Sequence, residues 1–500
     1  MNYSIAIDIG TTTVKAILFG EGSRVVAEAS REYATMHPKP SWAEQDPDAW
    51  WNGTVESIQK LLRTSQVNPA DIRVISVSSQ SPAVLPVDRE GRPLRPALIW
   101  MDRRSTEEHD ILKEKLGERH VFDLTGNRLD TYFTLTELMW CIRREPEVME
   151  KCYKLMQVNG YINSRLTGVF SIDISNATLT QYFDVHTESW SDELLNAIGA
   201  DKAWMPDVYQ CMDPLGTVTP EAAALTGLSE KTVVLAGAVD ATAAALEIGI
   251  NRGGKVAEVT GTSSLVLVGF DELVTTYDLC YLRGRKPGST VLYGPVNTAG
   301  GSLKWFRNHL YDRESRDDAA FDRINAEIEE KTNGPSGLIF LPYLTGERAP
   351  IWDPDARGTF IGVHMNTSRA QIMRSIMEGT SFALQDNLET AQRAGFSYPD
   401  IISCGGCTKS DIWLKIKASI IDRPIHVPEV NLGAQGGLSY INAAWMGEYA
   451  SPEEASESSF RIRKTVEPVR EWVEAYREYY EIYKASYQAL KPQFKAMARI

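Results

Sequence analysis

One short pattern occurs twice in the chain, and this repeat constrains the fold more than any single motif. An apolar segment runs into the polar turn Asp8-Ile-Gly-Thr-Thr-Thr13 and continues as a second apolar segment. The same order returns in the second half, where Gly261-Thr262-Ser263 separates residues 255–260 from residues 264–270. Two apolar runs joined by a short polar turn predict a β-hairpin. The repeat predicts two α/β domains of related architecture, which we place at residues 1–232 and 233–500.

Length and composition agree with two large domains. The 500 residues include 43% hydrophobic and 24% charged side chains, which is ordinary for a globular protein and excludes disordered and coiled-coil classes. A chain of this length buries large cores without covalent staples. The six cysteines are scattered along it, which argues against a disulfide scaffold and favours a reducing compartment.

The charge balance limits the expected partners. Lys and Arg total 52 against 66 Asp and Glu, a formal net charge of −14, which disfavours non-specific binding to nucleic acid or to an anionic membrane. No apolar run reaches the 18 residues or so that a membrane helix needs. The first residues follow a strand pattern and do not resemble a secretory signal. We therefore expect a cytoplasmic protein that binds a small molecule. A homodimer is compatible with the sequence.

Three further segments carry clear structural signals. Asp46-Pro47 is typical of a helix start, with Asp46 as the N-cap. Residues 72–78 predict a buried strand, and residues 83–87 predict its hairpin partner. The chain ends in a predicted helix, from 469 to about 491, whose aromatic residues follow one face and indicate packing surface.

The two Gly-Thr turns could hold phosphate groups. Backbone amides and hydroxyls at such a tip can surround a phosphate, and these would come from Gly10, Thr11, Thr12, Gly261, Thr262 and Ser263. Asp8 cannot bind phosphate directly, but its carboxylate can hold Mg²⁺ or the waters around it. The alternative is a pair of ordinary polar hairpins, which the repeat makes less attractive.

A glycine pair forms a third candidate site. Gly405 and Gly406 follow a predicted strand and precede a predicted helix. Glycine lets the backbone approach a flat ligand such as adenine, and a helix N-terminus favours phosphate. Cys404 and Cys407 have the spacing of a metal or redox pair, but zinc would need two more ligands and none is evident.

Asp240 is the carboxylate that we expect to carry chemistry. It follows the apolar segment 233–237 and opens an alanine-rich helix. The alternative role is a plain N-cap, which Asp often fills, and the two roles are compatible.

Polar and aromatic residues at the ends of apolar segments could form a polyol site. Such a site needs several hydrogen-bonding groups and an aromatic wall, and the candidates are Gln80, Ser81, Trp100, Asp102 and Tyr132. Each could also be a turn residue or part of a surface pair.

Together these segments resemble the FGGY carbohydrate kinases, and in particular xylulokinases, within the actin/hexokinase-like ATPases. The resemblance spans essentially the whole chain in order and rests on Asp8-Ile-Gly-Thr-Thr, Trp42-Ala-Glu-Gln-Asp-Pro47, Trp100-Met-Asp-Arg-Arg104, Gly237-Ala-Val-Asp240, Thr260-Gly-Thr-Ser263, Phe340 to Pro350, Glu378 to Leu384 and Gly405-Gly406. It implies two ribonuclease-H-like domains, with the sugar side in the first, the nucleotide side in the second, and ATP in a cleft between them.

The resemblance also implies roles for individual residues. Asp240 matches the general base that accepts the proton of the attacking sugar hydroxyl, and Asp8 matches the residue that helps to position Mg²⁺. Gly301, Gly405 and Gly406 match the nucleotide side. The sugar contacts fall at Gln80, Ser81, Trp100, Asp102 and Tyr132.

The substrate is less defined than the reaction. Xylulokinases carry Gln-Met-His-Gly where this chain has Gln80-Ser81-Pro82-Ala83, so the histidine is missing. A pentulose such as xylulose is the first expectation. Glycerol, gluconate or another polyol or ketose is the alternative, and an actin-like ATPase without a sugar acceptor or a sugar-binding pseudokinase are more distant ones.

Overall fold

The computed structural model describes residues 2–250, 253–285, 288–311 and 319–498. The chain forms two compact units. Unit 1 comprises Met1–Asn251, Tyr281–Thr290 and Asn431–Phe460, and unit 2 comprises Arg252–Cys280, Val291–Val430 and Arg461–Ile500.

The central sheet of unit 1 has the order β13-β14-β5-β1-β2-β3. Its strands are β1 (Tyr3–Ile9), β2 (Thr13–Gly20), β3 (Arg24–Glu32), β5 (Ile72–Ser79), β13 (Pro214–Thr217) and β14 (Val233–Leu235), and β15 (Ala238–Val239) also pairs with β5. β1 is antiparallel to β2 and parallel to β5, and β14 and β15 are parallel to β5. The first predicted hairpin is therefore confirmed.

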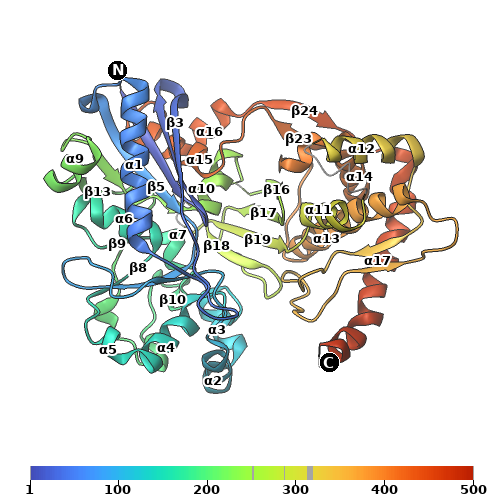
Figure 1. Cartoon of the computed structure of the whole chain (residues 1–500), viewed down its shortest axis with the longest axis horizontal. Coiled ribbons are helices and arrows are strands. Elements are labelled where there is room, and N and C mark those ends of the chain that lie inside the picture. The colour runs from blue at the N-terminus through green and yellow to red at the C-terminus, as the bar shows by residue number, and fades with distance from the viewer. Residues whose placement is uncertain (1, 251–252, 286–287, 312–318, 499–500) are drawn as a thin grey trace. The chain divides into compact units, whose positions relative to one another are not determined.

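Helices cover both faces of this sheet, because successive side chains of a strand point to opposite sides. Ile5, Ile7 and Ile9 share a core with Trp50 and Ile58 of helix α1 (Pro47–Ser65), which lies in front of the sheet in Figure 1. Asp46 caps α1 as predicted, since its side chain accepts a hydrogen bond from the Asp48 amide. The opposite face packs on α10 (Asp240–Glu247) and α15 (Ala434–Trp445).

The observed domain boundary differs from the predicted one because α10 and α15 pack within unit 1. The predicted boundary at 232 would assign residues 233–251 and 431–460 to the second domain, but both segments belong to unit 1. Leu246 of α10 and Leu438 of α15 share a core with Ala6 of β1. Two helices that lie far apart in the sequence thus pack on the same apolar face of the unit 1 sheet.

The rest of unit 1 is built around a smaller sheet of order β4-β7-β6-β8. β6 (Ala83–Val87) pairs with β7 (Ala97–Ile99) and β8 (Lys154–Met156), so the predicted pairing of residues 83–87 with 72–78 is wrong. The chain leaves the central sheet after β5 and enters the second sheet at Ala83, after three intervening residues. The remaining elements are β4 (Glu44–Gln45), α2 (Thr106–Leu116), α3 (Glu118–Thr125), α4 (Thr134–Arg144), α5 (Pro146–Met149), α6 (Val158–Thr167), β9 (Ser171–Asp173), α7 (Ile174–Ala177), β10 (Phe183–Asp184), β11 (Ser189–Trp190), α8 (Asp192–Ile198), β12 (Asp207–Tyr209), α9 (Pro220–Thr226), β18 (Cys280–Arg283) and α16 (Pro452–Ser459).

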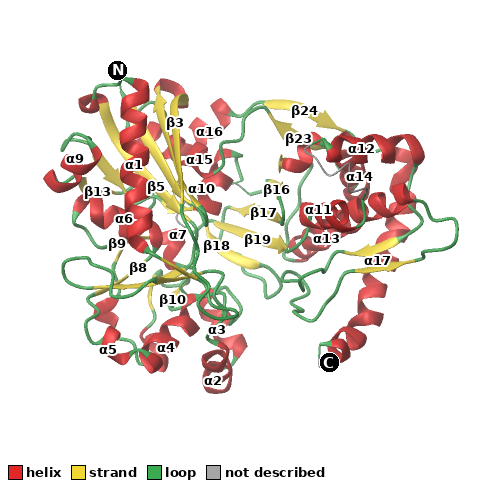
Figure 2. Ribbon diagram, in the orientation of Figure 1, coloured by secondary structure: helices red, strands yellow, loops and turns green. Residues whose placement is uncertain are grey.

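Unit 2 repeats the order of the unit 1 sheet. Its strands follow the order β19-β17-β16-β22-β23-β24, formed by β16 (Val256–Thr260), β17 (Ser264–Phe270), β19 (Thr290–Val296), β22 (Ile401–Gly405), β23 (Ile425–Pro428) and β24 (Ile462–Val466). β16 is antiparallel to β17 and parallel to β22, β23 is parallel to β22, and β24 is antiparallel to β23. The second predicted hairpin and the repeated architecture are thus confirmed. Figure 2 shows helices packed around the sheet strands within each unit.

Helices α13 (Arg369–Arg393) and α17 (Arg470–Met497) form much of the unit 2 core. The aromatic face of α17 is packing surface as predicted, since Tyr476 and Tyr483 are 1% exposed and contact Phe382 of α13. The other elements are α11 (Gly300–His309), α12 (Ala320–Lys331), β20 (Ile339–Leu341), β21 (Thr359–Ile361) and α14 (Asp411–Ile421).

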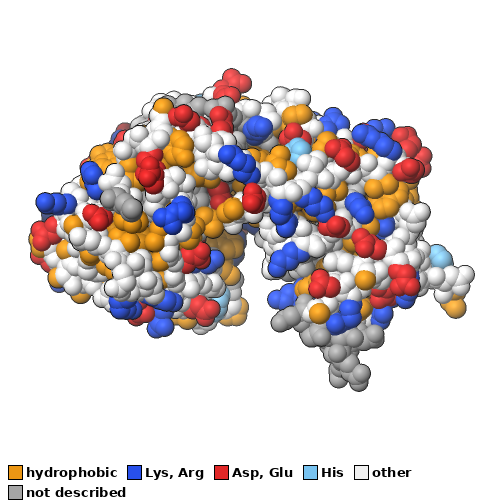
Figure 3. Space-filling view, turned by 90° about the horizontal axis from the view of Figure 1, so that it is seen from above, with side chains coloured by type: hydrophobic (Ala, Val, Ile, Leu, Met, Phe, Trp, Pro, Cys, Tyr) orange, Lys and Arg blue, Asp and Glu red, His pale blue; other side chains and the backbone are white. Residues whose placement is uncertain are grey.

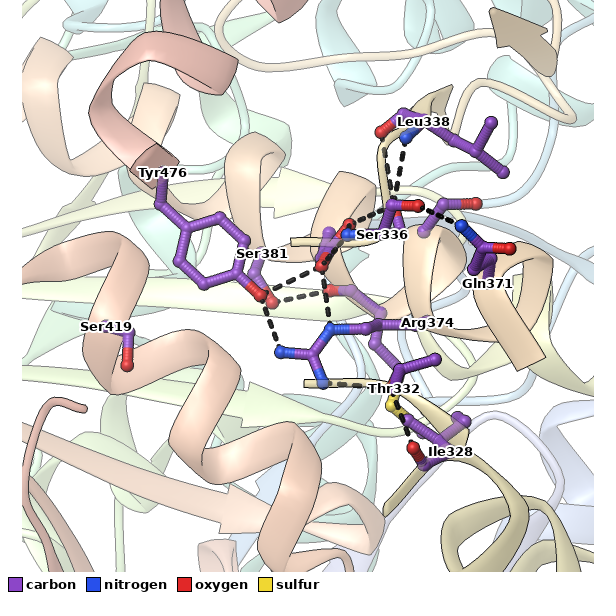
Figure 4. A network of polar contacts seen from close by, with 12 residues as sticks. Ile328, Thr332, Ser336, Leu338, Gln371, Arg374, Ser381, Ser419 and Tyr476 are labelled. Carbon is purple, nitrogen blue, oxygen red and sulfur yellow. Dashed lines mark hydrogen bonds and ion pairs between the residues drawn. The ribbon is translucent and has the colours of Figure 1, made fainter. Parts of the chain in front are cut away.

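A buried polar network ties α13 to α17 (Figure 4). The Arg374 guanidinium donates to the Tyr476 hydroxyl at 3.0 Å and pairs with Glu378 at 3.0 Å. Tyr476 donates to Glu378 at 2.8 Å, and the Ser336 amide donates to the same carboxylate at 3.0 Å. Glu378, which opens one of the segments of the sequence resemblance, therefore supports the core of unit 2.

The surface charges are mixed in sign. Figure 3 shows Lys and Arg side chains interspersed with Asp and Glu on the visible face. The excess of acidic residues does not form a single patch on that face. Among the residues that the structure describes, no helix combines the length and apolar character that a membrane span requires.

Candidate active site

Three parallel strands of unit 1 end side by side and bring the predicted residues of the first half together. In the β1–β5 ladder Ile9 is level with Ser79, and in the β15–β5 ladder Val239 is level with the same Ser79. Asp8, Gln80 and Asp240 lie at or just beyond these carboxyl ends. Ligands of open α/β sheets bind at this edge, so the topology favours a site here.

A close backbone contact allows Asp240 to reach this edge. Gly237 has a φ of +80°, and a Cβ added to it would lie 1.9 Å from the Val77 carbonyl oxygen. A side chain at this position would displace the turn between β14 and β15. Gly237 therefore determines the course of the backbone from β14 to Asp240.

Asp240 is the first residue of α10 and not its cap. Val239 occupies the cap position, and the Asp240 Oδ1 atom accepts a hydrogen bond from the neighbouring Ala241 amide at 2.6 Å. The N-cap alternative is therefore wrong. Burial, with a further contribution from the negative charge of Asp8, raises the pKa of Asp240 to about 7. A carboxyl group that keeps some exposed surface and titrates near neutrality suits a general base.

Asp8 provides a second carboxyl group at the same strand ends. Its Oδ1 atom accepts a hydrogen bond from Ser78 at 2.9 Å. Burial raises the pKa of Asp8 to about 6, and the Ser78 hydrogen bond and the charge of Lys15 oppose this rise. Mg²⁺ is commonly bound through one or two carboxylates together with phosphate oxygens and waters. Asp8, next to the first Gly-Thr turn, fits that pattern.

The first hairpin tip is held in one shape. The Gly10 amide donates to the Thr13 carbonyl at 3.0 Å, and the hydroxyl of Tyr33 donates to the Gly10 carbonyl. The Thr12 side chain is exposed at the tip. The tip therefore presents hydroxyl and amide groups on a supported loop.

Trp100 and Tyr132 form an aromatic wall beside this hairpin. The Trp100 indole nitrogen donates to the Thr11 hydroxyl at 3.2 Å, and the two ring centroids are 6.2 Å apart. The Tyr132 hydroxyl donates to the Ser81 carbonyl at 3.1 Å. The structure therefore links four of the predicted residues, namely Thr11, Ser81, Trp100 and Tyr132.

Gln80 is a buried residue near the ends of these strands. The side chain is 2% exposed, and its Nε2 atom donates to the Gln45 Oε1 atom at 2.7 Å. Within the described part of the chain, its Oε1 atom is buried and has no hydrogen-bond partner. A ligand hydroxyl is the kind of donor that would satisfy it.

Asp102 differs from the other predicted sugar contacts because its carboxylate is already occupied. It is fully buried, accepts from the Ala43 amide at 2.6 Å and forms an ion pair with Arg104 at 2.8 Å. Arg104 in turn lies over the Trp42 ring. Asp102 thus supports the loop that carries Trp100, and the sequence could not show this because charge pairing depends on the fold.

The second hairpin carries the other group of predicted residues. Its tip is exposed, and the Gly261 amide donates to the Ser263 carbonyl at 2.8 Å. The Gly301 amide, in the first turn of α11, donates to the Thr262 carbonyl at 2.8 Å. Unit 2 therefore brings Gly301 next to the hairpin tip.

Gly405 ends the strand that pairs with the tip end of the same hairpin, and Gly406 follows that strand. Gly405 is level with Thr260 in the β16–β22 ladder, has a φ of +87°, and would place a Cβ 2.5 Å from the Thr260 carbonyl oxygen. A 3₁₀ turn, Gly406–Lys409, comes before α14. The helix predicted after the glycine pair is confirmed, since α14 begins at Asp411, and both glycines are exposed.

A buried ion pair behind this hairpin was missed by sequence reasoning. Glu258 of β16 is 0% exposed, and the Lys417 Nζ atom of α14 lies 2.5 Å from its Oε1 atom. Lys417 also donates to the Thr260 hydroxyl at 3.0 Å. Burial raises the pKa of Glu258, but the Lys417 charge and the hydrogen bonds from Lys417, Ser403 and Thr260 together hold it below the ordinary value. An acidic residue inside the apolar strand Val-Ala-Glu-Val-Thr was the available signal.

A buried glutamate near α11 was missed as well. Glu347 Oε1 accepts hydrogen bonds from the Asn297 and Arg348 amides, each at 2.9 Å. Burial raises the pKa of Glu347 to about 8. The sequence signal for this glutamate is the Thr-Gly-Glu-Arg segment, which contributes to the family resemblance but does not by itself indicate burial.

The described residues contain no group of three or more His, Cys, Asp or Glu side chains placed to hold a metal ion. Cys404 and Cys407 are buried and form no disulfide with another described residue, and neither belongs to such a group.

Known proteins resemble this chain over nearly its whole length. The N-terminal domain of the FGGY family of carbohydrate kinases matches residues 3–247, and the C-terminal domain of that family matches residues 256–445. A xylulose kinase of Bacillus subtilis is 33% identical over 463 residues, covering 92% of each chain. A xylulose kinase of Staphylococcus xylosus is 31% identical and covers 94% of this chain and 96% of its own.

A solved structure agrees with the fold. The xylulose kinase of Rhodospirillum rubrum superposes with a TM-score of 0.91 at 28% identity, covering 99% of this chain and all of its own. Kinases of this kind take ATP as the phosphoryl donor. The chain belongs to the FGGY family of carbohydrate kinases and is a sugar phosphotransferase.

Proposed function

We propose that this kinase phosphorylates a hydroxyl group of a small ketose, with a pentulose such as xylulose as the first candidate. The observation that carries the proposal is Asp240, a partly exposed carboxyl with a pKa of about 7 at the strand ends that also present Asp8 and Gln80. The names of the similar proteins support xylulose, while the Ser81-Pro82 pair, in place of a histidine, leaves other ketoses and polyols as alternatives.

The site residues of unit 1 have separate roles in this proposal. Asp240 accepts the proton of the attacking hydroxyl and orients its oxygen toward the γ-phosphorus. The Gln80 Oε1 atom accepts a hydrogen bond from a second hydroxyl of the sugar. Trp100 and Tyr132 contact the carbon skeleton and exclude water from that side, which favours the sugar over water as the acceptor.

The phosphate groups of ATP are assigned to the glycine-rich tips. Gly261, Thr262 and Ser263 offer exposed amides and hydroxyls, and Gly301, Gly405 and Gly406 lie beside them in unit 2. Gly10, Thr11 and Thr12 offer the same groups in unit 1. Asp8 would hold Mg²⁺, which neutralises charge on the phosphate oxygens when it is bound.

A substrate panel tests the proposal. ADP formation is measured with Mg-ATP and xylulose, ribulose, fructose, glycerol or gluconate, and without any acceptor. We expect a ketose to give the highest kcat/KM and acceptor-free hydrolysis to be slow. Preference for glycerol or gluconate would replace the ketose assignment. ATP hydrolysis that no acceptor changes would instead indicate an ATPase.

Replacing Gln80 should affect the sugar and not ATP. Loss of a buried hydrogen-bonding group costs about 1–3 kcal/mol, so Gln80→Ala should raise the sugar KM about five- to a hundredfold. The KM for ATP should change little. Steady-state kinetics with each substrate varied in turn measures both, and Gln392→Ala, at an exposed position of α13, is the control. A defect confined to ATP would refute the assignment.

Replacing Gly261 should affect ATP and not the fold. Apart from its two chain neighbours, a Cβ at this position would have no atom of the described residues nearer than the Ser263 carbonyl oxygen at 4.0 Å, so Gly261→Val should fold normally. The added side chain would occupy space next to the exposed amides and weaken ATP binding by tenfold or more. Titration calorimetry measures ATP affinity, and sugar affinity is the internal control. Gly10→Val probes the other tip, and unchanged ATP affinity in both variants would remove the two-hairpin assignment.

A further inference from the structure

A buried polar cluster in unit 1 lies next to both the proposed base and the proposed sugar contacts. It consists of Asp173, Ser175 and Asn176, which are 1%, 0% and 0% exposed. Asp173 ends β9 and caps the short helix α7, accepting a hydrogen bond from the Asn176 amide at 3.0 Å. No step of the mechanism above uses these residues.

One arm of the cluster holds the main chain that leads into Asp240. The Val239 amide donates to the Ser175 hydroxyl oxygen at 2.9 Å, and the same hydroxyl donates its own proton to Asp173. Val239 immediately precedes Asp240. A shift of Ser175 would therefore move the first turn of α10 and the carboxyl group on it.

The second arm reaches the sugar side. The Ser81 hydroxyl donates to the Asn176 Oδ1 atom at 2.6 Å, and the Asn176 Nδ2 atom donates to the Asp173 Oδ2 atom at 2.6 Å. Ser81 follows Gln80 directly and receives the Tyr132 hydroxyl on its carbonyl. The position of these contacts thus depends on Asn176.

A third set of contacts fixes the cluster to its surroundings. Asn159 of α6 donates to the Asp173 Oδ2 atom at 2.8 Å, and Asn163 donates to the Ala236 carbonyl at 2.9 Å. The Asp173 carboxylate therefore accepts four hydrogen bonds from Ser175, Asn176 and Asn159. A buried carboxylate with this many donors is held in one orientation.

We propose that Asp173 is a positioning residue, which sets the distance between the proposed base and the bound sugar through Ser175 on one side and Asn176 on the other. The inference rests on the proposed function of Asp240 and Gln80. A catalytic group displaced by about 1 Å can lose about 10²-fold in rate, so a rigid link between base and acceptor contacts has a direct kinetic consequence.

The two arms predict different kinetic defects. Ser175→Ala removes the acceptor of the Val239 amide, so kcat should fall about 10- to 100-fold with the KM values for sugar and ATP within about threefold of the wild type. Asn176→Ala removes the partner of Ser81, so the sugar KM should rise at least fivefold. Thr178→Val is the control, because Thr178 is equally buried at the end of α7 and, among the described residues, its hydroxyl hydrogen-bonds only to the Ser175 carbonyl.

The pH dependence separates positioning from a loss of stability. In Ser175→Ala the acid limb of the kcat/KM profile should shift, because the surroundings of Asp240 change, whereas Thr178→Val should keep the wild-type profile. Ser175→Cys, with a similar shape and a weaker acceptor, should fall between wild type and Ser175→Ala. It also replaces Ser175→Ala if that variant does not fold.

The possible outcomes are distinct. If Ser175→Ala and Thr178→Val show the same kcat, KM and pH profile, the cluster is only structural and the inference is overturned. If the wild-type protein shows no acceptor-dependent ADP formation, the proposed function fails first. In that case the thermal stability of the variants still reports whether the cluster supports the fold.

Discussion

Asp240→Asn should lower kcat by about 10²- to 10⁴-fold, the usual contribution of a general base. Asparagine keeps the oxygen that accepts the Ala241 amide, so α10 should still begin at the same residue. The substitution removes only the ability to take up a proton. Steady-state kinetics with a good acceptor, ATP titration calorimetry and thermal unfolding together measure the effect, and ATP affinity and Tm should stay near wild type.

The control for this variant is Asp192→Asn. Asp192 is also the first residue of a helix, α8, but it is exposed and lies outside the site. An Asp240→Asn variant that retained more than about a tenth of the wild-type kcat, with chemistry rate-limiting, would remove the catalytic assignment.

The pH profile gives a second measure of the same group. A general base acts in its deprotonated form, and the pKa of Asp240 is about 7. The value of kcat/KM should therefore rise tenfold per pH unit below about pH 7 and level off above it. A flat profile between pH 5 and 8 would contradict the assignment. Asp240→Asn should lose this acid limb.

Lys417→Met should destabilise unit 2 by about 3–5 kcal/mol, because removing one partner of a buried ion pair leaves the other charge uncompensated. Glu258 and Lys417 are both nearly inaccessible to solvent, at 0% and 2% exposure. Urea denaturation followed by tryptophan fluorescence measures the change in the free energy of unfolding. Glu258→Gln combined with Lys417→Met removes both charges and should recover much of the loss.

A surface ion pair supplies the matched control. Lys464 pairs with Asp411, whose side chain is 61% exposed, and exposed pairs contribute about 0–1 kcal/mol. Lys464→Met should therefore have a small effect. If Lys417→Met were equally mild, the buried pair would not be a determinant of the stability of unit 2. ATP affinity of folded Lys417→Met would further report whether the pair supports the Thr260 end of the hairpin.

The features that the sequence predicted correctly are local. The two hairpins follow from apolar runs on either side of a Gly-Thr turn, and the start of α1 follows from Asp46-Pro47. The tyrosines of α17 recur at helical spacing, which indicated their common buried face. In each case the information lies within a few residues, since hydrogen bonding in turns and caps and the periodicity of side chains depend on near neighbours.

The features that the sequence could not provide depend on residues far apart. The predicted domain boundary differs from the observed one because α10 and α15 both pack on one face of the unit 1 sheet. That sheet contains β1, which lies at the start of the chain. Lys417 could not be matched to Glu258 before the fold was known.

The candidate site also combines features that the sequence predicts with features that depend on the tertiary structure. The sequence by itself determined which residue types it contains, from Asp8 and Gln80 to Asp240. The tertiary structure decided how each of them is buried and paired. It paired Asp102 with Arg104, left the Gln80 Oε1 atom without a partner among the described residues, and linked Asp173 through Ser175 to the Val239 amide next to Asp240. The physical reason is that burial, pairing and pKa depend on every group packed around a side chain, and those groups come from all parts of the chain.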